Sequence, residues 1–404
     1  MQKKIKELLG RKIRVAMYIN HSEEMKNACT VYRNITPFKF LKDDVEVRYV
    51  HRVETQIDFY PLTKNIKEIK IDAEPIEWAD IVVFSRHYYN VALMGCLSEV
   101  AENMNKVIVY ETDDLLHRVV QNVGKHNKGE IANKMNNDLR FVDYALSNAD
   151  LVTVSTDNLR DFYSNKVKRA GIQVLPNCFN PNKWRFLYEY KKVRDFIRKK
   201  ILKKNKIRIG WQGGNNHFLN NFNYIVEPLN ELHKKYGTEF EFVIMSGLHP
   251  GLDAYGGDKD KRKFLDFDYI HVKSVSIDKF PQRLAELDLD IGLIFVEDNE
   301  FSRAKSNIKW MEYALLGIPA ISSRCEPYLK TNAVLVNNTT EEWMAAIEDL
   351  MHNPKKCAII GEEARVMANE FNIKNQAKKW LDAYLSVLIS KLENKKVADL
   401  DSKN

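Results

Sequence analysis

Residues 289–324 read LDIGLIFVEDNEFSRAKSNIKWMEYALLGIPAISSR, and these residues contain the clearest signal of the fold class. It begins with an apolar run at 289–296, continues through a polar loop, and enters a segment with apolar residues at helical spacing. Gly317 and Pro319 stop that segment, and a second short apolar run follows at 319–324. The stretch therefore predicts a strand, a helix and a second strand, which is the repeating unit of a parallel sheet.

The same rhythm recurs along the chain, because two sets of apolar, β-branched runs alternate with segments long enough for crossover helices. The first set lies at 12–19, 45–50, 80–85, 106–111, 149–155 and 171–176, and the second at 206–213, 240–247, 269–274, 289–296, 319–324 and 333–338. Helices between parallel strands cover both faces of a sheet, so the sequence predicts an α/β protein with two Rossmann-like, doubly wound domains. We expect the ligand in a cleft between them, beside the carboxyl ends of the strands.

The domain boundaries follow from these two sets of runs. We expect an N-terminal domain over 1–180 and a C-terminal domain over 206–375. Between them, 181–205 is rich in Lys and Arg and is typical of a solvated linker helix, with a binding patch as the alternative. The last segment, 376–404, has apolar residues at helical spacing and predicts an amphipathic helix that returns to the first domain, with a frayed polar tail over 394–404.

Composition excludes several classes of protein. With 404 residues, 45% of them hydrophobic and 29% charged, the chain is typical of a globular protein of two domains. No apolar run approaches the roughly 20 residues of a membrane-spanning helix, and the N-terminus lacks a secretory pattern, so we expect a cytoplasmic protein. The five cysteines have no metal-ligand spacing, which predicts neither disulfides nor structural zinc. A net charge of +7 favours a polyanionic partner only weakly.

Polar residues crowd around the start of the helix in the opening stretch. Ser306 or Asn307 can serve as its N-cap, and the free backbone N–H groups there carry a partial positive charge. Arg303 and Lys305 add full positive charges to the same region. Such a helix end is a candidate for binding phosphate.

Lys305, Lys309 and Glu312 follow one another at i, i+4 and i+7, which predicts that they share a helix face away from the apolar stripe. A carboxylate one to two turns behind a bound pyrophosphate could accept hydrogen bonds from both hydroxyls of a ribose. The alternative is a capped surface helix with an ordinary Lys309–Glu312 ion pair.

The run DNEFSRAKSNIKWMEYALLGIPAISSRCEPY, residues 298–328, resembles the nucleotide-sugar signature of retaining glycosyltransferases with the GT-B fold. The resemblance is to the bacterial and phage group known as group 1 or O-antigen-type transferases. Three further segments agree with it: YRNITPFKFL at 32–41, YETDDLL at 110–116, and RIGWQGGNNHF at 208–218. The similarity extends from about residue 12 to residue 385 and implies a GT-B fold.

This resemblance implies roles for individual residues. Glu312 matches the second acid of the family's Glu-x7-Glu motif, which binds the ribose of the nucleotide. The first acid of that motif would fall at Ala304, so the sequence departs from the family there. The residues that bind the donor sugar are therefore not identified by the motif. Lys305 and the amides of Ser306 and Asn307 are placed to neutralise the diphosphate.

A second candidate segment follows the first strand of the C-terminal domain. Gly213 and Gly214 allow a close approach of the backbone to a ligand. Asn215, Asn216 and His217 supply donors toward the same phosphates, and His217 could protonate the departing phosphate oxygen. The alternative is a tight turn between a strand and a helix.

Three acids, Glu111, Asp113 and Asp114, follow the fourth strand of the N-terminal domain, where the family often has a group that touches a sugar. We expect Asp113 to orient the acceptor hydroxyl or the donor sugar, with Asp114 as the second choice and a helix-capping Asp as the alternative. Adjacent acids differ from the metal-binding DxD of the other main transferase fold, so no metal is expected.

Arg33 and Arg86 follow the first and third strands and are candidates to line the cleft, with surface ion pairs as the alternative.

The resemblance implies transfer of a sugar from a nucleotide-sugar donor to an acceptor hydroxyl, with retention of anomeric configuration and without a metal cofactor. The expected acceptor is a surface glycan or a lipid-linked glycan. The basic composition and the Lys-rich run over 191–208 also suit a phage enzyme that glycosylates modified bases in DNA. The third hypothesis is a nucleotide-sugar-binding protein that has lost catalysis, and Ala304 is its support.

Overall fold

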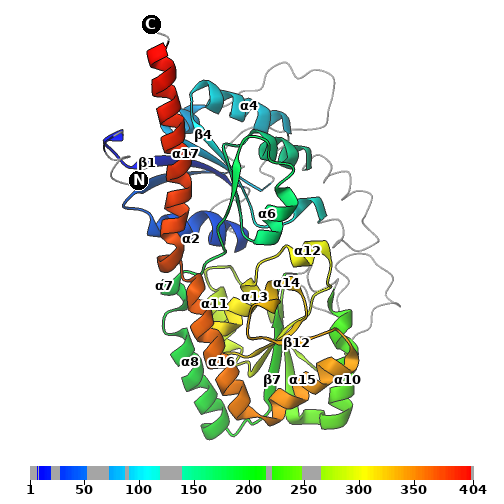
Figure 1. The fold of residues 1–404 in the computed structure, drawn as a ribbon. Helices are drawn as coiled ribbons and strands as arrows, with labels where there is room; N and C mark the ends of the chain where they lie inside the picture. Colours follow the sequence, from blue (N-terminus) through cyan, green and yellow to red (C-terminus); the bar gives the residue numbers. More distant parts are fainter. Residues whose placement is uncertain are drawn as a thin grey trace. The chain divides into compact units, whose positions relative to one another are not determined.

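The computed structural model divides the chain into two compact units. Unit 1 comprises Met1–His117, Glu130–Phe179 and Ile373–Asn404, and unit 2 comprises Arg118–Gly129 and Asn180–Asn372 (Figure 1). The structure describes residues 7, 9–19, 28–51, 72–86, 91–118, 139–214, 221–247 and 265–401, with side chains omitted at 91–94 and 396–401.

The sheet of unit 1 has six strands in the order β2-β1-β3-β4-β5-β6, and every described pair is parallel. The strands are β1 (Ile13–Ile19), β2 (Val45–His51), β3 (Ile81–Ser85), β4 (Val107–Thr112), β5 (Leu151–Val154) and β6 (Gly171–Val174). Every residue of β3, β4 and β5 is buried, as expected for central parallel strands with both faces covered. The six predicted runs of the first set are therefore strands, and their ends agree within two residues.

The helical elements of unit 1 are η1 (Thr30–Ile35), α2 (Thr36–Phe40), α3 (Glu74–Trp78), α4 (Val91–Asn103), α6 (Asp157–Tyr163) and α17 (Ile373–Asp401). The apolar stripe predicted for the C-terminal helix is buried against this unit, since Trp380 and Tyr384 belong to its core. Tyr384 stacks on Phe38 of α2 with 5.5 Å between ring centroids. Helix α17 continues to Asp401, so the prediction of a frayed tail from 394 was wrong over most of its length.

The sheet of unit 2 also has six parallel strands, in the order β12-β11-β10-β7-β8-β9. They are β7 (Ile207–Gln212), β8 (Phe240–Ser246), β9 (Ile270–Lys273), β10 (Ile291–Ile294), β11 (Ala320–Ser323) and β12 (Val334–Val336). The six predicted runs of the second set are thus confirmed as strands. The order places β7 and β10, which precede the two candidate phosphate loops, side by side.

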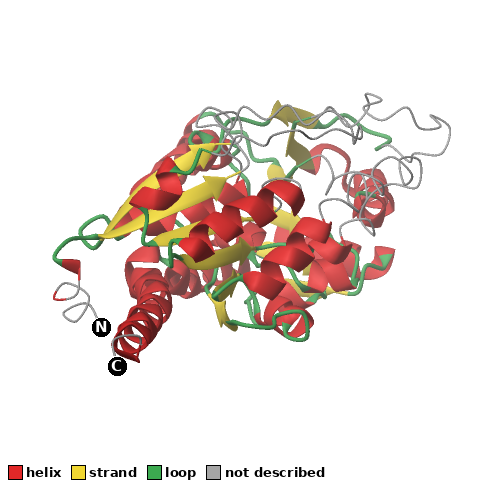
Figure 2. Cartoon of the chain, turned by 90° about the horizontal axis from the view of Figure 1, so that it is seen from above, coloured by secondary structure: helices red, strands yellow, loops and turns green. Residues whose placement is uncertain are grey.

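The helical elements of unit 2 are α7 (Pro181–Trp184), α8 (Leu187–Phe196), η4 (Ile197–Ile201), α10 (Asn223–Tyr236), η5 (Gly237–Glu239), α11 (Phe280–Glu286), α12 (Glu300–Arg303), α13 (Ile308–Ala314), α14 (Glu326–Leu329), α15 (Thr340–His352), α16 (Pro354–Ala368) and η7 (Asn369–Phe371). The segment expected as a linker over 181–205 contains α7, α8 and η4 and falls within unit 2. Helices surround the strands in Figure 2.

Alternation along β10 shows how this sheet is covered on both faces. Ile291 and Leu293 pack in one core cluster with Trp343 of α15. Gly292, between them, points to the opposite face, where a side chain would collide with the ring of Tyr313 from α13 at 2.7 Å. The absence of a side chain at Gly292 therefore lets α13 lie directly on the strand.

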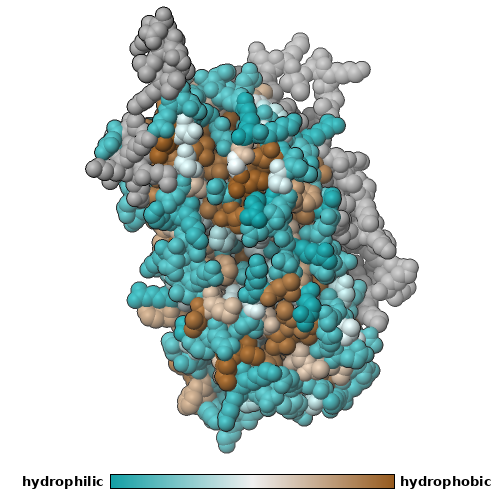
Figure 3. Space-filling view, in the orientation of Figure 1, coloured by the Kyte–Doolittle hydropathy of each residue, from teal (hydrophilic) through white to brown (hydrophobic). Residues whose placement is uncertain are grey.

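Within the described residues, no helix is both long and apolar enough to cross a bilayer. On the face drawn in Figure 3, hydrophilic residues predominate, and hydrophobic residues form smaller patches among them.

Candidate functional site

Helix α13 has the ends that its sequence predicts. It begins at Ile308 with Asn307 in the N-cap position, although the Asn307 side chain makes no capping hydrogen bond. At its other end Gly317 has a φ of 65°, its N–H donates to the carbonyl of Ala314 at 2.9 Å, and the N–H of Ile318 donates to Tyr313 at 3.1 Å. This pair of bonds is a Schellman motif, which explains why glycine is needed at the stop.

The residues before α13 differ from the prediction of one continuous helical face. Residues 304–307 separate α12 from α13, so Lys305 precedes the helix. The Lys305 ammonium lies over the ring of Phe301, 4.4 Å from its centroid. Lys305, Ser306 and Asn307 are all half-buried.

Glu312 is 4% exposed, which argues against the alternative of a capped surface helix with an ordinary ion pair. Its Oε2 accepts a hydrogen bond from Nε2 of Gln212 at 2.7 Å. Gln212 is the last residue of β7 and is itself 5% exposed. Because a buried carboxylate needs a polar partner, this bond fixes Glu312 at the carboxyl end of the central strand.

Lys309 reaches the same point from the first turn of α13. Its Nζ donates to the backbone carbonyl of Gln212 at 2.6 Å and lies 4.7 Å from the centroid of the Trp211 ring. Burial lowers the pKa of the Lys309 ammonium to about 8, although nearby Glu312 acts in the opposite direction. A cation and an anion from one helix therefore converge on the end of β7.

The backbone after Gln212 leaves no room for a side chain at the first glycine. A Cβ at Gly213 would contact the Lys309 ammonium and would lie 2.7 Å from Cζ2 of Trp211. A Cβ at Gly214 would meet nothing within 4 Å. The structure thus distinguishes two glycines that the sequence treats alike. The predicted donors Asn215, Asn216 and His217 lie outside the described residues.

Arg303 has a different environment from the one expected beside a phosphate. It is exposed, and its guanidinium makes two hydrogen bonds of 2.7 Å to the carboxylate of Asp298. The charge that it brings to this end of α13 is therefore balanced by Asp298.

In unit 1, Arg86 binds both candidate acids that follow β4. One guanidinium nitrogen lies 2.7 Å from Oδ1 of Asp113 and 2.7 Å from Oδ2 of Asp114, and 3.0 Å from Sγ of Cys29. Arg86 has a left-handed φ of 57°, and its N–H donates to the carbonyl of Glu111 at 2.7 Å. Arg86 was predicted as a candidate to line the cleft, and in the structure its guanidinium is largely used in holding the two acids.

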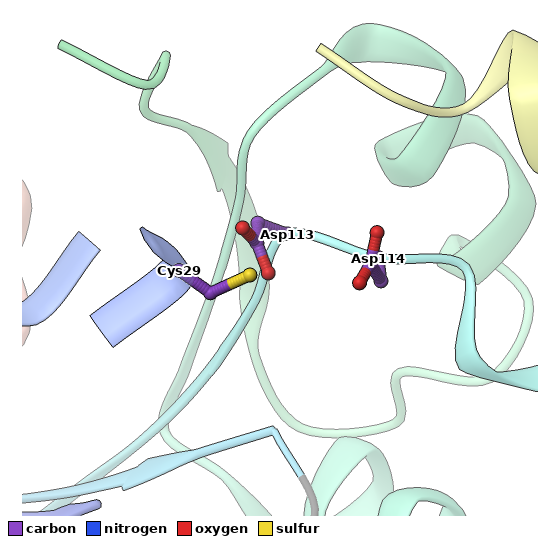
Figure 4. Close-up of side chains that lie close together, drawn as sticks. All are labelled: Cys29, Asp113 and Asp114. Atoms are coloured by element: carbon purple, nitrogen blue, oxygen red, sulfur yellow. The ribbon is translucent and has the colours of Figure 1, made fainter. Parts of the chain in front are cut away.

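Cys29 is a member of this cluster that the sequence analysis did not single out. Its thiol points toward Asp113 in Figure 4, and burial raises the pKa of the thiol well above its ordinary value, with Asp113 adding to the effect. Cys29 lies ten residues beyond the end of β1, so no spacing in the sequence connects it with the acids.

The donor atoms of Cys29, Asp113 and Asp114 lie within 4.8 Å of one another, close enough to ligate one metal ion. Arg86 already places a cation against all three side chains. A divalent ion at this point would be repelled by the guanidinium, so the residues present fit a metal poorly. Independence from metals stays a prediction.

Arg33 and Glu111 are both buried inside unit 1, where they pair with each other. Arg33 is 0% exposed, Glu111 is 1% exposed, and Nε of Arg33 lies 2.6 Å from Oε1 of Glu111. Arg33 also donates to the carbonyl of Leu175 and lies over the Trp380 ring at 4.6 Å. Burial raises the pKa of Glu111, while Arg33 opposes the rise. This packing differs from the prediction that the two side chains line an open cleft.

Comparisons with known proteins agree on the fold. No protein-family model matches the sequence, and no curated protein matches it. Solved structures do match, among them a glycosyltransferase from Rickettsia africae with a TM-score of 0.60, 16% identity, and 94% of this chain and 99% of that chain covered.

Two further structures resemble the chain to a similar degree. An alpha,alpha-trehalose 6-phosphate synthase from Burkholderia multivorans has a TM-score of 0.57 and 8% identity, covering 94% of this chain and 99% of that one. An E. coli trehalose-6-phosphate structure bound with UDP-2-fluoro glucose has a TM-score of 0.58 and 11% identity, covering 93% and 99%. At such identities the likeness establishes the fold, which is the GT-B fold predicted from the sequence.

Proposed function

We propose that this protein is a glycosyltransferase and that unit 2 binds its nucleotide-sugar donor. The observation that carries the proposal is the convergence of Lys309 and Glu312 on Gln212, at the carboxyl end of β7. Ligands of doubly wound sheets bind beside the carboxyl ends of strands. A protein of the same fold is bound with UDP-2-fluoro glucose, which supports a donor of this class.

The two ionic side chains suit the two polar parts of a nucleoside diphosphate. The Glu312 carboxylate can accept hydrogen bonds from both ribose hydroxyls, and such charge-assisted bonds are the stronger kind. The Lys309 ammonium, with its lowered pKa, gains a favourable charge partner when a diphosphate arrives. Because Gly213 has no side chain, the Lys309 ammonium can lie close against the backbone at that position.

The chemistry then consists of departure of the nucleoside diphosphate while positive charge develops at the anomeric carbon. Lys305, Lys309 and the amides of Ser306 and Asn307 would stabilise the charge that grows on the leaving oxygen. Preorganised donors of this kind can contribute about 3 kcal/mol each to a barrier. We propose that the reaction proceeds with retention and without a metal, and that His217 assists the leaving phosphate.

We propose that Asp113, with Asp114 as the alternative, orients the acceptor hydroxyl or the donor sugar. In the free protein Arg86 neutralises both carboxylates. An acceptor hydroxyl would have to compete with Arg86 for one carboxylate oxygen, so these acids are better suited to positioning than to abstracting a proton. The proposed acceptor is a surface or lipid-linked glycan, and the proposed location is the cytoplasm.

Ala304 stands where the family has the first acid of its motif, and it is 2% exposed. This position therefore offers no carboxylate to a sugar hydroxyl. A nucleotide-sugar-binding protein without catalysis is the second candidate function, and Ala304 is the observation that favours it.

The test incubates the full chain with UDP-, GDP- and ADP-sugars and measures nucleotide release with and without glycan acceptors. Release that Glu312→Ala reduces, while Glu326→Ala on the exposed part of α14 does not, would support transfer at this site. Nucleotide binding without any release would favour the binding protein. Release only with duplex DNA containing modified bases would favour the DNA hypothesis.

A further inference from the structure

Helices α8 and η4 turn several charged residues inward and most of their large apolar residues outward. Lys191 is 7% exposed and Arg198 is 4% exposed, whereas Phe196 is 60% and Ile201 is 62% exposed. A surface helix in water normally shows the reverse pattern, with its apolar stripe facing the core. This reversal corrects the interpretation of the basic run as a plain solvated face.

Ion pairs hold the inner side of this helical segment to unit 2. Arg194 binds Asp288 at 2.8 Å, and Arg198 and Lys199 bind the two oxygens of Asp290 at 2.7 and 2.6 Å. Asp290 immediately precedes β10, so the segment is fixed to the sheet. The outward direction of its apolar side chains is therefore set by the fold.

The outward side chains repeat at helical spacing and form what we call the apolar stripe. Positions 190, 193, 197 and 201 are separated by three or four residues and so share one side of the helical segment. Exposed large apolar residues of the segment are Phe186, Tyr190, Val193, Phe196, Ile197, Ile201 and Leu202. In Figure 3, tan and brown atoms lie among teal ones at the lower left, where Figure 1 places α8. Contiguous exposed apolar residues of this kind mark an interaction surface.

Cations cluster at the C-terminal end of the apolar stripe. Lys200, Lys203 and Lys204 are exposed, and none of them has an ion-pair partner among the residues that the structure describes. Between 185 and 206, Glu189 is the one exposed acid. The stripe and its lysines therefore present apolar groups and uncompensated positive charge side by side.

The combination of exposed apolar side chains and lysines indicates which kind of partner can bind this surface. A second copy of the chain, related by a twofold axis, would present the same surface, whose one exposed acid is Glu189, to these three lysines. Duplex DNA offers phosphates but no apolar surface for Phe196 and Ile201. An anionic lipid surface offers both, since acyl chains lie directly beneath charged headgroups.

We propose that α8 and η4 form a docking surface for an anionic lipid membrane. The segment lies in the plane of the interface, with its apolar stripe among the upper acyl chains and its lysines at the headgroups. Such a helix rests on the membrane without crossing it. This inference does not depend on sugar transfer, because it is carried by residues outside the candidate donor site.

The experiment measures co-flotation of the full chain with phosphatidylcholine vesicles that contain or lack phosphatidylglycerol. One variant removes apolar contact by Phe196→Ser and Ile201→Ser, and its matched control is Met104→Ser with Leu329→Ser. A second variant neutralises Lys200, Lys203 and Lys204 by substitution with Gln, and its control neutralises Lys42, Lys168 and Lys234, which are also exposed. Thermal unfolding and UDP binding of each variant verify that unit 2 is intact.

We expect binding to the anionic vesicles only. The apolar variant should lose at least about tenfold in affinity, because partitioning depends on buried apolar area. The lysine variant should lose about a hundredfold at low salt, from the attraction of an anionic surface for each of three cations. The proposal would be overturned by failure to float with anionic vesicles, by equal floating of the variants and their controls, or by a dimer that the apolar variant abolishes.

Discussion

The carboxylate of Glu312 accepts a hydrogen bond from the side-chain amide of Gln212, with 2.7 Å between Oε2 and Nε2, although the two residues are 100 positions apart. Both side chains are buried, so each satisfies the other. The bond ties helix α13 to the end of β7 and holds a carboxylate beside the Lys309 ammonium. This arrangement is the basis of the donor site proposed for unit 2.

Substitution of Glu312 should weaken nucleotide binding, and loss of the whole carboxylate should weaken it more than loss of its charge alone. Glu312→Gln keeps a hydrogen-bond acceptor but loses the charge, and we expect about tenfold weaker binding of a nucleotide sugar. Glu312→Ala should weaken binding further and lower the free energy of unfolding by about 1–3 kcal/mol, because the Gln212 amide loses its partner. Calorimetric titration and thermal unfolding measure the two effects, with Glu326→Gln as the exposed control. Unchanged affinity in the alanine variant would remove Glu312 from the site.

Affinity for a nucleotide sugar should fall as pH rises above about 8, the pKa of Lys309 in the free protein. A bound diphosphate favours the charged amine, so above this pH binding must take up a proton and weakens by up to about tenfold per pH unit. Lys309→Met should bind more weakly and should flatten the pH profile. A profile that keeps the same slope in the methionine variant would assign the titration to another group.

The same lowered pKa has an opposite consequence for the stability of the free protein. Between pH 8 and 10.5 the unfolded chain holds more protons on Lys309 than the folded chain does. The contribution of this residue to the free energy of unfolding therefore rises with pH through that window. Comparison of urea unfolding for wild type and Lys309→Met across the window isolates the contribution.

Gly213→Ala and Gly214→Ala form a matched pair of substitutions. The new methyl group at position 213 meets Lys309 and Trp211, whereas the one at 214 has open space. We expect Gly213→Ala to displace the ammonium and lower nucleotide affinity at least about tenfold, at a cost to stability of about 1–3 kcal/mol. Gly214→Ala should leave the free protein's stability nearly unchanged. Equal stability of the two variants would contradict the packing described around Gly213.

The buried pair of Arg33 and Glu111 should show strong coupling in unit 1. Removal of one partner, as in Arg33→Leu or Glu111→Leu, leaves a buried charge and should cost about 3–5 kcal/mol. The double variant should be more stable than the sum of the single effects predicts. Unfolding followed by a probe in unit 1, such as fluorescence of Trp380 in a chain lacking the other tryptophans, measures the coupling. Additive effects would show that the pair contributes no net interaction.

Much of the fold could be predicted from the sequence, because parallel strands buried on both faces are continuous apolar runs. The C-terminal end of α13 could also be predicted, since Gly317 and Pro319 act through their own backbone preferences. These features depend on local chemistry, which a single sequence displays.

The partners of the candidate site residues could not be predicted in the same way. Gln212 was overlooked although it ends a predicted strand, a position that could have identified it. Its bond to Glu312 depends on where α13 lies along β7, and only the folded chain determines that placement. Cys29 does not end a predicted strand, so its position in the sequence does not connect it with the acids.

The basic run shows a further limit of sequence interpretation. Lys191 and Arg198 suggested a solvated face because both are charged. Aspartates on another part of the chain, Asp288 and Asp290, determine which side of the helix turns inward. Composition within the segment contains no information about them.

The most direct test of the donor site is a crystal structure of the full chain with a nucleoside diphosphate, chosen from UDP, GDP and ADP by the largest rise in melting temperature. We predict that the ribose hydroxyls lie within hydrogen-bond distance of the Glu312 carboxylate and that the diphosphate lies beside Lys309 and Gly213. A nucleotide bound elsewhere, with Glu312 still closed on Gln212, would contradict the account.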